Sequence, residues 1–595
     1  MIKNRNDISD CFKWSVNDLF SNDEMWQTEF DELSKKINDI KNFNPLTEDN
    51  LIDCLKKQDE LGLRTERVYV YANLKANEDS SNTFYQGMAS KSDTLISEYS
   101  SAVSFIEPSI LKMDENKIFE VLNSNTDAAV YKHMIKNILR TKEHILPHEQ
   151  EEIISRFYEV SSAPENIYSM LNNADLVFKD VKASDGKVYN ITHGKYISLL
   201  ESQDRVLRKN AFESYYDSFY KLKNSISSIY AASVKNDVAI SKIKKYNSSL
   251  EASLFSVNVD KEVYINLIDT VNRYLPLMHR YIKLRKKMLS VDELHMYDLY
   301  TPIIKDTNTY MDFENAKKTV LCAIKPLGED YSYEFEKGLN EGWIDVYENK
   351  GKRSGAYAWG AYGTHPFVSL NYDNTINSMF TLAHEMGHAM HSFYTWKNQP
   401  YVYGDYTIFV AEVASTVNEA LLMEYLLKTT NDEDKKMYLI NYFMEQFRGT
   451  LFRQTMFAEF EMKTHEMCEN AQPLNFDSLC EIYGNLNKKY YGDEIINDKQ
   501  INWEWARIPH FYNSFYVYQY ATGYSAAIAL SKKILEDNGA ENYIKFLKSG
   551  SSDYSINLLK LAGVDMSSPA PVENAMKVFE KLIEQMENYF ERMNK

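Results

Sequence analysis

One short motif constrains the fold of this chain more than any other feature of its sequence. The run 381–391 contains the pattern His-Glu-x-x-His at His384, Glu385 and His388. Residues four apart lie one turn above each other on a helix, so both imidazoles reach one metal ion if this run is helical. The flanking Ala, Met and Leu residues favour a buried helix. The sequence therefore predicts a buried helix with two metal ligands and, at Glu385, an adjacent acid–base group.

Zinc is the expected metal, with one ion per chain, because neutral imidazole and carboxylate ligands suit it. A catalytic zinc keeps three protein ligands and one open position, so a third ligand must be found. His391 follows closely, but on a straight helix it lies seven residues and about 10 Å from His384. We therefore interpret His391 as a packing residue or as support behind the ligands.

A better third ligand lies downstream, in the apolar stretch 409–420. Glu412 stands between Ala411 and Val413 in this stretch, and a carboxylate in such a setting is seldom buried without a partner. Its distance of 24 residues from His388 leaves room for a loop and an adjacent helix. Glu419, seven residues further on and on the same face, is predicted to orient a ligand histidine. An exposed position remains the alternative for Glu419.

Long helices are expected over most of the chain. Only 20 glycines and 13 prolines occur in 595 residues, which leaves few tight turns. Helical spacing recurs through the N-terminal third and again over about 195–289, and one β-hairpin is predicted between them. Its strands would be 176–178 and 188–191, on either side of Asp185-Gly186. We expect a boundary after this hairpin, with an N-terminal helical region over 1–195 and a catalytic domain over 196–595.

The net charge of the chain limits the classes of partner that it is expected to bind. A net charge of −18 argues against a nucleic-acid binder and against docking on an anionic membrane. No apolar stretch reaches the roughly 20 residues that span a bilayer, and the first residues lack the apolar core of a signal peptide. Five scattered cysteines without paired spacing make a reducing cytoplasm the expected location.

A glycine-rich segment precedes the motif. Four of the twenty glycines fall within 351–372, and this segment ends in the extended run 367–371. Such a segment is typical of a backbone that approaches a ligand, although a surface loop that enters a small sheet explains it equally well. On the first interpretation, Gly355, Phe367 and Ser369 contact the substrate, and the extended run pairs with a peptide backbone.

The joint set of motifs resembles a known family. The runs His384–His391 and Ala411–Glu419 are similar to the thimet oligopeptidase-like zinc metallopeptidases, most closely to their bacterial branch, oligoendopeptidase F. The similarity extends from about residue 120 to near the C-terminus. Further matching stretches are 171–178, 353–372, 452–461 and 507–524.

The resemblance implies a mainly α, two-lobed helical shell around a deep substrate channel, with a small β-sheet beside the active-site helix. It implies a family-type N-terminal domain at about 115–185 and cleavage of short peptides. Carried over by motif, His384, His388 and Glu412 match the zinc ligands, and Glu385 matches the catalytic base. His510 matches the histidine that, with nearby tyrosines, stabilises the tetrahedral intermediate. Among several tyrosines we favour Tyr516 and Tyr520, which are four residues apart.

Two alternatives stay open at this point. A carboxypeptidase or peptidyl-dipeptidase on the same shell needs a cation that binds the free carboxylate of the substrate, and Arg453 and Arg507 are the nearby candidates. A catalytically silent peptide-binding protein is the other alternative. The intact metal motif, Glu412 and His510 argue against it. The sequence makes no prediction of the oligomeric state.

Overall fold

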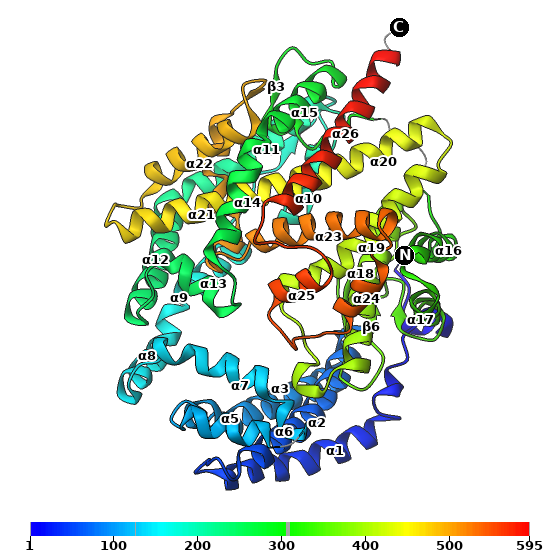
Figure 1. Cartoon of the computed structure of the whole chain (residues 1–595). Coiled ribbons are helices and arrows are strands. Elements are labelled where there is room, and N and C mark those ends of the chain that lie inside the picture. The colour runs from blue at the N-terminus through cyan, green and yellow to red at the C-terminus, as the bar shows by residue number, and fades with distance from the viewer. Residues whose placement is uncertain (1, 125, 305–309, 594–595) are drawn as a thin grey trace. The chain divides into compact units, whose positions relative to one another are not determined.

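The computed structural model describes residues 2–124, 126–304 and 310–593, and it is mainly α-helical (Figure 1). This confirms the predicted fold class. The chain divides into two compact units, and each unit draws on three stretches of sequence. Unit 1 comprises Met1–Glu143, Thr309–Tyr425 and Leu530–Val564, and unit 2 comprises His144–Asn308, Leu426–Ala529 and Asp565–Lys595. The boundary between 195 and 196 and the substrate channel stay predictions.

Unit 1 begins with a helical region whose core forms around α2 and α3. Asn22 caps its first helix, because its side chain accepts a hydrogen bond from the Met25 N–H at 2.9 Å. Trp26, on this helix, is fully buried, and its indole N–H donates to the Val68 carbonyl at 2.8 Å. The helices of this region are α1 (Asp23–Lys36), α2 (Leu51–Glu78), α3 (Thr83–Val103), α4 (Ile106–Ile110), α5 (Glu115–Asn123), α6 (Thr126–Ala129) and α7 (Lys132–Leu139).

The rest of unit 1 surrounds a three-stranded sheet. Its strands are β4 (Ile344–Asp345), β5 (Tyr357–Trp359) and β6 (Phe367–Ser369), in the order β4-β6-β5. The predicted small sheet beside the motif helix is present, because β5 and β6 both contact α18. The helices of this part are α16 (Phe313–Ile324), α17 (Glu329–Asn340), α18 (Ile376–Asn398), α19 (Ile408–Thr429), α24 (Ala540–Leu547) and α25 (Ser555–Leu561).

The order of the strands corrects one prediction. β6 is the central strand: it pairs with β4 in parallel and with β5 in antiparallel orientation. Its backbone groups are therefore used on both sides, and the extended run 367–371 cannot also pair with a peptide through β6. The prediction that this run pairs with the substrate is wrong, because strands distant from it along the chain occupy both edges of β6. β5 is the edge strand next to it.

Unit 2 is also helical, with two minor sheets. β1 pairs with β2 in a hairpin, and β3 pairs in parallel with β7. The elements of this unit are α8 (His148–Ser161), α9 (Ala163–Met170), β1 (Val181–Lys182), β2 (Val188–Tyr189), α10 (His193–Leu200), α11 (Arg205–Lys221), α12 (Lys223–Ile243), α13 (Ser249–Ser256), α14 (Lys261–Arg273), α15 (Leu275–Met288), β3 (Leu294–His295), α20 (Glu433–Gln446), α21 (Arg453–Glu469), α22 (Phe476–Tyr491), β7 (Ile495–Ile496), α23 (Tyr518–Glu536) and α26 (Ala570–Met593). The last turns of α19 and α23 are counted with the other unit.

The hairpin forms around the predicted Asp-Gly turn, but its first strand lies further along the chain than predicted. Gly186 has a φ of +84°, and Val181 faces Tyr189 across the pair. A short loop brings together only residues at equal distance from it, so 181–182 pairs with 188–189 and the predicted strand 176–178 is out of reach. Phe178 instead stacks on Tyr215, with ring centroids 4.8 Å apart.

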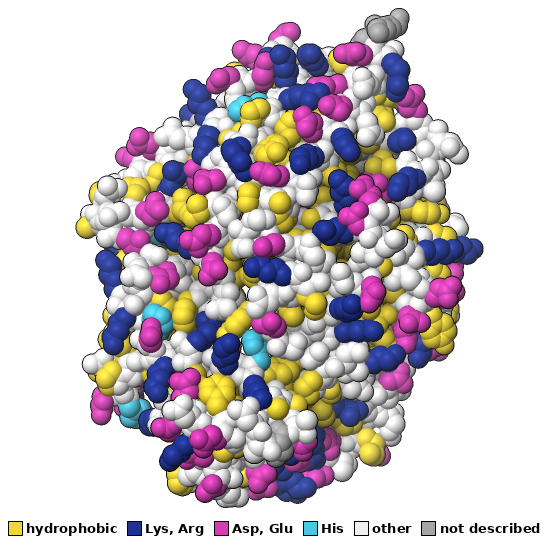
Figure 2. Space-filling view, in the orientation of Figure 1, with side chains coloured by type: hydrophobic (Ala, Val, Ile, Leu, Met, Phe, Trp, Pro, Cys, Tyr) yellow, Lys and Arg dark blue, Asp and Glu magenta, His cyan; other side chains and the backbone are white. Residues whose placement is uncertain are grey.

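Acidic and basic side chains are interspersed on the face of the molecule seen in Figure 2. Among the described helices, none is long and apolar enough to cross a membrane.

Candidate metal centre

The motif helix, α18, starts where a side chain caps it. The hydroxyl of Thr375 accepts a hydrogen bond from the Ser378 N–H at 3.1 Å, which satisfies one of the free N–H groups of the first turn. His384 and His388 follow on one face of the helix, as predicted. Their rings lie with centroids 4.9 Å apart.

A glycine lets the second helix approach the first. If Gly387 carried a Cβ atom, that atom would lie 2.6 Å from Ser415 Cα and 2.7 Å from the Ala414 carbonyl oxygen. The backbones of α18 and α19 are therefore in direct contact at this point. Asn418, fully buried on α19, reinforces the contact by donating to the Ala383 carbonyl at 3.2 Å. The crossing places the first turns of α19 beside both histidines.

Glu412, on α19, reaches both imidazoles. Its Oε2 atom lies 3.4 Å from His384 Nε2 and 3.6 Å from His388 Nε2. One ligand atom from each of the three residues lies within 4.8 Å of the others. The bonds to the two histidines outweigh the partial burial of Glu412, which by itself favours the neutral form, and they hold the pKa of Glu412 well below its usual range.

This donor set fits zinc. A tetrahedral zinc ion with bonds of about 2.0–2.1 Å keeps its ligand atoms roughly 3.4 Å apart, close to the two distances found here. Two neutral imidazoles and one carboxylate are also a usual catalytic set, in which the fourth position stays open. His384, His388 and Glu412 are thus the residues that would hold the metal.

Two further side chains on α19 orient these groups. Glu419 Oε1 bonds His384 Nδ1, so the other ring nitrogen, Nε2, is the one directed at Glu412. Although burial alone would lower the pKa of His384, the bonds to Glu412 and Glu419 raise it. The Ser415 hydroxyl donates to Glu412 Oε2 at 3.1 Å. Glu419 therefore lies where the sequence predicts an orienting carboxylate.

Glu385 lies beside the three ligands with its side chain largely out of water. It is 7% exposed, and burial raises its pKa against the opposing influence of His384 and His388. A carboxylate whose pKa is raised toward neutrality is suited to accept and return a proton near pH 7. The position and environment match those expected of a general base.

His391 is not one of the grouped ligands, because its side chain packs into the core. It is 1% exposed, and its ring stacks on Tyr406 at a centroid distance of 3.7 Å. Burial lowers its pKa to about 3, so the ring is neutral at physiological pH. The Tyr406 hydroxyl bonds the His388 carbonyl at 3.4 Å and so links this stack to the ligand turn.

The three residues predicted to contact substrate differ in whether they are buried or line a cavity. Phe367 and Ser369 are 0% and 2% exposed, so their side chains belong to the core. Gly355 lines a cavity of about 240 Å³ in unit 1, which Thr381 on α18 also borders. Thr381 precedes the ligand His384 by three residues. Of the three, Gly355 alone lines this cavity.

His510, Tyr516 and Tyr520 lie together in unit 2, as their spacing predicts. His510, on the short 3-10 helix Pro509–Tyr512, has its ring centroid 6.2 Å from that of Tyr516 and 6.1 Å from that of Tyr520. The Tyr520 hydroxyl donates to the Tyr516 hydroxyl at 3.3 Å. Partial burial lowers the pKa of His510, which favours the neutral imidazole at pH 7.

A buried carboxylate holds the turn in front of Tyr516. Phe515 has a φ of +60°, which is uncommon for a residue with a side chain, and its N–H donates to Glu461 Oε1 at 2.8 Å. Glu461 is fully buried on α21, and burial raises its pKa well above the usual value. The Ser514 hydroxyl bonds Asp237 Oδ2 at 2.6 Å.

With this geometry described, comparisons with known proteins identify the family. A model described as peptidase family M3 matches residues 198–578. The chain belongs to peptidase family M3. A second model, described as oligopeptidase F, matches residues 109–178, so the predicted family is confirmed.

Individual M3 relatives resemble the whole chain. Oligopeptidase PepF of Bacillus subtilis is 45% identical over 98% of this chain and 88% of its own length. Oligoendopeptidase F of Enterococcus faecium has a solved structure that is 38% identical, with a TM-score of 0.74, over 96% of this chain and 99% of its own. A solved structure from Chlamydophila abortus is 32% identical, with a TM-score of 0.93, over 98% and 99%.

Sequence reasoning about this M3 peptidase missed three residues that shape the centre. Gly387 permits the helix crossing, Ser415 bonds the third ligand, and Asn418 ties α19 to α18. Gly387 stands within an apolar helix, where a glycine is unfavourable unless packing requires it, and this was the available signal. Ser415 and Asn418 are polar residues in an apolar stretch, the same signal that identified Glu412.

Proposed function

We propose that the chain is a zinc-dependent endopeptidase that hydrolyses short oligopeptides. The observation that supports it best is the set His384, His388 and Glu412, whose ligand atoms have the spacing of a zinc site on a chain of peptidase family M3. When bound, the metal supplies Lewis acidity to a water and to the scissile carbonyl.

Glu385 is proposed as the general base. It accepts a proton from the attacking water and delivers it to the leaving amine. Its burial supports this role, because the raised pKa brings the carboxylate closer to the pH at which a shared proton moves both ways. Glu419 keeps Nε2 of His384 free for the metal by holding Nδ1.

His510 and one of the two tyrosines are proposed to stabilise the oxyanion of the tetrahedral intermediate. The family resemblance supports these roles, and so does the grouping of the three rings in unit 2. A neutral imidazole and a phenol each carry one N–H or O–H donor for the developing charge. Tyr516 and Tyr520 are both kept as candidates, and the hydrogen bond of 3.3 Å between their hydroxyls links the two donors.

The edge strand β5 is proposed as the surface that meets the peptide backbone. It has β6 on one side, it contacts α18, and the cavity lined by Gly355 and Thr381 lies in the same unit. Recognition through backbone groups tolerates many side chains, in keeping with a general oligopeptidase. A substrate with N-methylated backbone amides near the scissile bond should bind more weakly than its unmethylated parent.

The exopeptidase alternative needs a cation that is available to the substrate. Arg453 and Arg507, the candidates from the sequence, both donate to Glu504 Oε1, at 2.8 Å and 2.9 Å. A guanidinium that already binds a buried carboxylate is a poor receptor for a second, mobile one. These contacts support the endopeptidase over the carboxypeptidase.

The experiment that tests the proposal is mass spectrometry of the products from one peptide of about ten residues. The enzyme is assayed with zinc, after chelation, and after zinc is restored. Internal cleavage that disappears on chelation and returns with zinc is the expected result. Stepwise loss from one end would favour the exopeptidase, and absence of cleavage with zinc bound would favour the silent binding protein. A cytoplasmic location is proposed with the same function, and cell fractionation tests it.

A further inference from the structure

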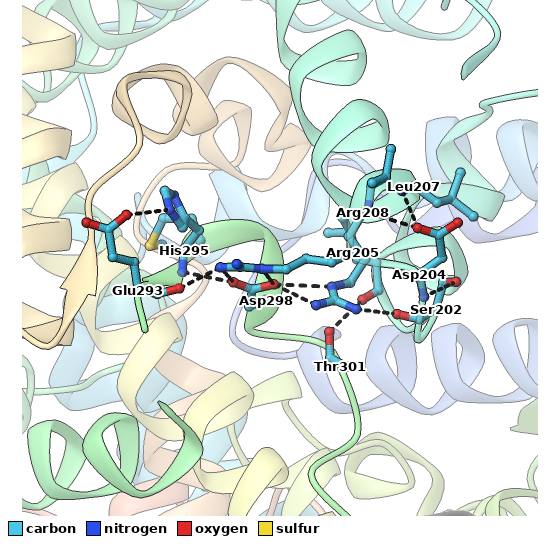
Figure 3. A network of polar contacts seen from close by, with 12 residues as sticks. Ser202, Asp204, Arg205, Leu207, Arg208, Glu293, His295, Asp298 and Thr301 are labelled. Carbon is cyan, nitrogen blue, oxygen red and sulfur yellow. Dashed lines mark hydrogen bonds and ion pairs between the residues drawn. The ribbon is translucent and has the colours of Figure 1, made fainter. Parts of the chain in front are cut away.

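Unit 2 contains a network of arginines and carboxylates that the proposed function does not use. At one end, the fully buried Asp298 lies between the partly exposed Arg205 and the buried Arg208: its Oδ2 lies 2.9 Å from Arg205 Nη2, and its Oδ1 lies 2.8 Å from Arg208 Nη2 (Figure 3). Arg285, also buried, donates to the Thr301 carbonyl at 2.6 Å and to Glu445 Oε1 at 2.9 Å.

The network continues to a small cavity with three more guanidinium groups. Arg448 binds Glu445, while Arg453 and Arg507 share Glu504. Glu445 is thus divided between Arg285 and Arg448. The cavity measures about 20 Å³, and it is lined by Arg448, Arg453, Arg507, Tyr300, Glu504 and a ring of aromatic and apolar side chains.

The guanidinium groups have donors left over. Arg448 donates through Nε and Nη2, Arg453 through Nη2, and Arg507 through Nε and Nη2. Among the residues that the structure describes, no acceptor is found for Nη1 of Arg448 or of Arg453. Arg448 as a whole is only 4% exposed, so bulk water has little access to it.

The pKa of Tyr300 reflects the excess of positive charge beside the cavity. Its ring lies against Arg448, with the guanidinium carbon 4.8 Å from the ring centroid. Burial by itself would raise the pKa of Tyr300, but Arg453, Arg448 and Arg507 outweigh burial and lower it. The space beside this ring therefore favours negative charge.

We propose that this cavity is a binding site for one small inorganic anion of the halide class, chloride under ordinary conditions. Three guanidinium groups against the single lining carboxylate Glu504 provide the charge, and their remaining N–H groups provide the donors. A cavity of about 20 Å³ exceeds the roughly 10–15 Å³ that one water needs, which suits a monatomic ion and is too small for a tetrahedral oxyanion or a peptide end.

Occupancy would join three segments of unit 2. Arg448 lies on the helical turn Phe447–Phe452, Arg453 begins α21, and Arg507 ends the 3-10 segment Lys499–Arg507. A shared anion replaces repulsion among three like charges by attraction to one centre. The expected consequence is a more stable unit 2. The proposal does not depend on the peptidase activity, because both of its readouts are binding and stability.

Bromide locates the site directly. Crystals of the full-length protein grown in sodium bromide should give an anomalous difference peak in the cavity between the three guanidinium groups. In solution, replacement of sodium gluconate by sodium chloride or bromide at constant ionic strength should raise the thermal midpoint in a saturable way, by about 2 °C or more. Constant ionic strength separates a bound ion from general screening.

The test variant is Arg453→Lys, which keeps a positive charge next to Glu504 and removes the guanidinium donors. The halide concentration at half effect should rise roughly tenfold. Arg273→Lys is the matched control, since Arg273 forms a half-exposed ion pair with Glu573 in the same unit, and it should leave the halide effect unchanged. If Arg453→Lys does not fold, Tyr300→Phe is the second test variant. It removes a hydroxyl from a residue that lines the cavity and keeps the ring against Arg448.

Three results would overturn the proposal. One is a midpoint that does not respond to halide together with no bromide peak in the cavity, which would leave water as the occupant. Another is a tyrosinate absorbance at neutral pH that Tyr300→Phe abolishes, since Tyr300 would then supply the negative charge itself. A bromide peak that remains when Arg453→Lys has no effect on the half-effect concentration would also contradict the assigned ligands.

Discussion

Gly387→Ala tests whether the close helix crossing builds the metal site. The added Cβ would lie 2.6 Å from Ser415 Cα and 2.7 Å from the Ala414 carbonyl oxygen. Both neighbours are backbone atoms, so no side chain can turn aside. Since ordinary contacts of this kind lie at about 3.5 Å, the two helices must separate locally by roughly 1 Å. Glu412 lies one turn before Ser415 and moves with it.

The magnitude follows from two opposing effects. Alanine is better than glycine inside a helix by about 1 kcal/mol, so helix propensity alone predicts a more stable protein. Overpacking a tight contact costs about 1–3 kcal/mol, and here it falls on rigid backbone, so we expect a net loss of stability. A displacement of about 1 Å at Glu412 should also weaken zinc binding roughly tenfold to hundredfold.

The assay measures thermal unfolding of the zinc-loaded protein and zinc affinity by competition with a chelator. Gly87→Ala is the matched control, because Gly87 lies within α3 of the same unit and its added Cβ would meet nothing within 4 Å. The control should be neutral or stabilising and should keep its zinc affinity. If Gly387→Ala behaved like Gly87→Ala in both measurements, the crossing would not be what positions Glu412.

Four further predictions address the site. Glu385→Gln should retain zinc and lose at least about a hundredfold in kcat, and near-normal turnover would exclude Glu385 as the base. Glu412→Ala should lose stoichiometric zinc by metal analysis, and an undiminished content would transfer the ligand role to Glu419. Tyr520→Phe should lower kcat roughly a hundredfold with a smaller change in KM, whereas a change in KM alone would make it a binding residue. Burial lowers the pKa of His391 to about 3, so the unfolded state takes up the proton first and stability falls with pH below about 6.5. His391→Phe should flatten that fall between pH 7 and pH 5, and an unchanged slope of the thermal midpoint would refute this cause.

Features that depend on nearby residues were predictable. The cap at Asn22, the Asp-Gly turn and the two histidines on one helix face each follow from a few consecutive residues. The role of Glu412 was predictable for a similar reason, since a lone carboxylate in an apolar stretch needs a partner. The strand order was not predictable, because β6 becomes central only when β4 and β5, distant along the chain, pair with it.

A polar residue within an apolar helix signals a partner but does not say which one. Glu412 meets two imidazoles, whereas Glu461, fully buried on α21, accepts from the backbone N–H of Phe515. The same holds for charge: Arg453 and Arg507 suggested a receptor for a substrate carboxylate, yet Glu504 occupies both. The sequence thus indicates where burial needs an electrostatic counterpart. Only the fold decides whether that counterpart is a metal, a backbone group or another side chain, and in the arginine-lined cavity it leaves donors for which the described chain supplies no acceptor.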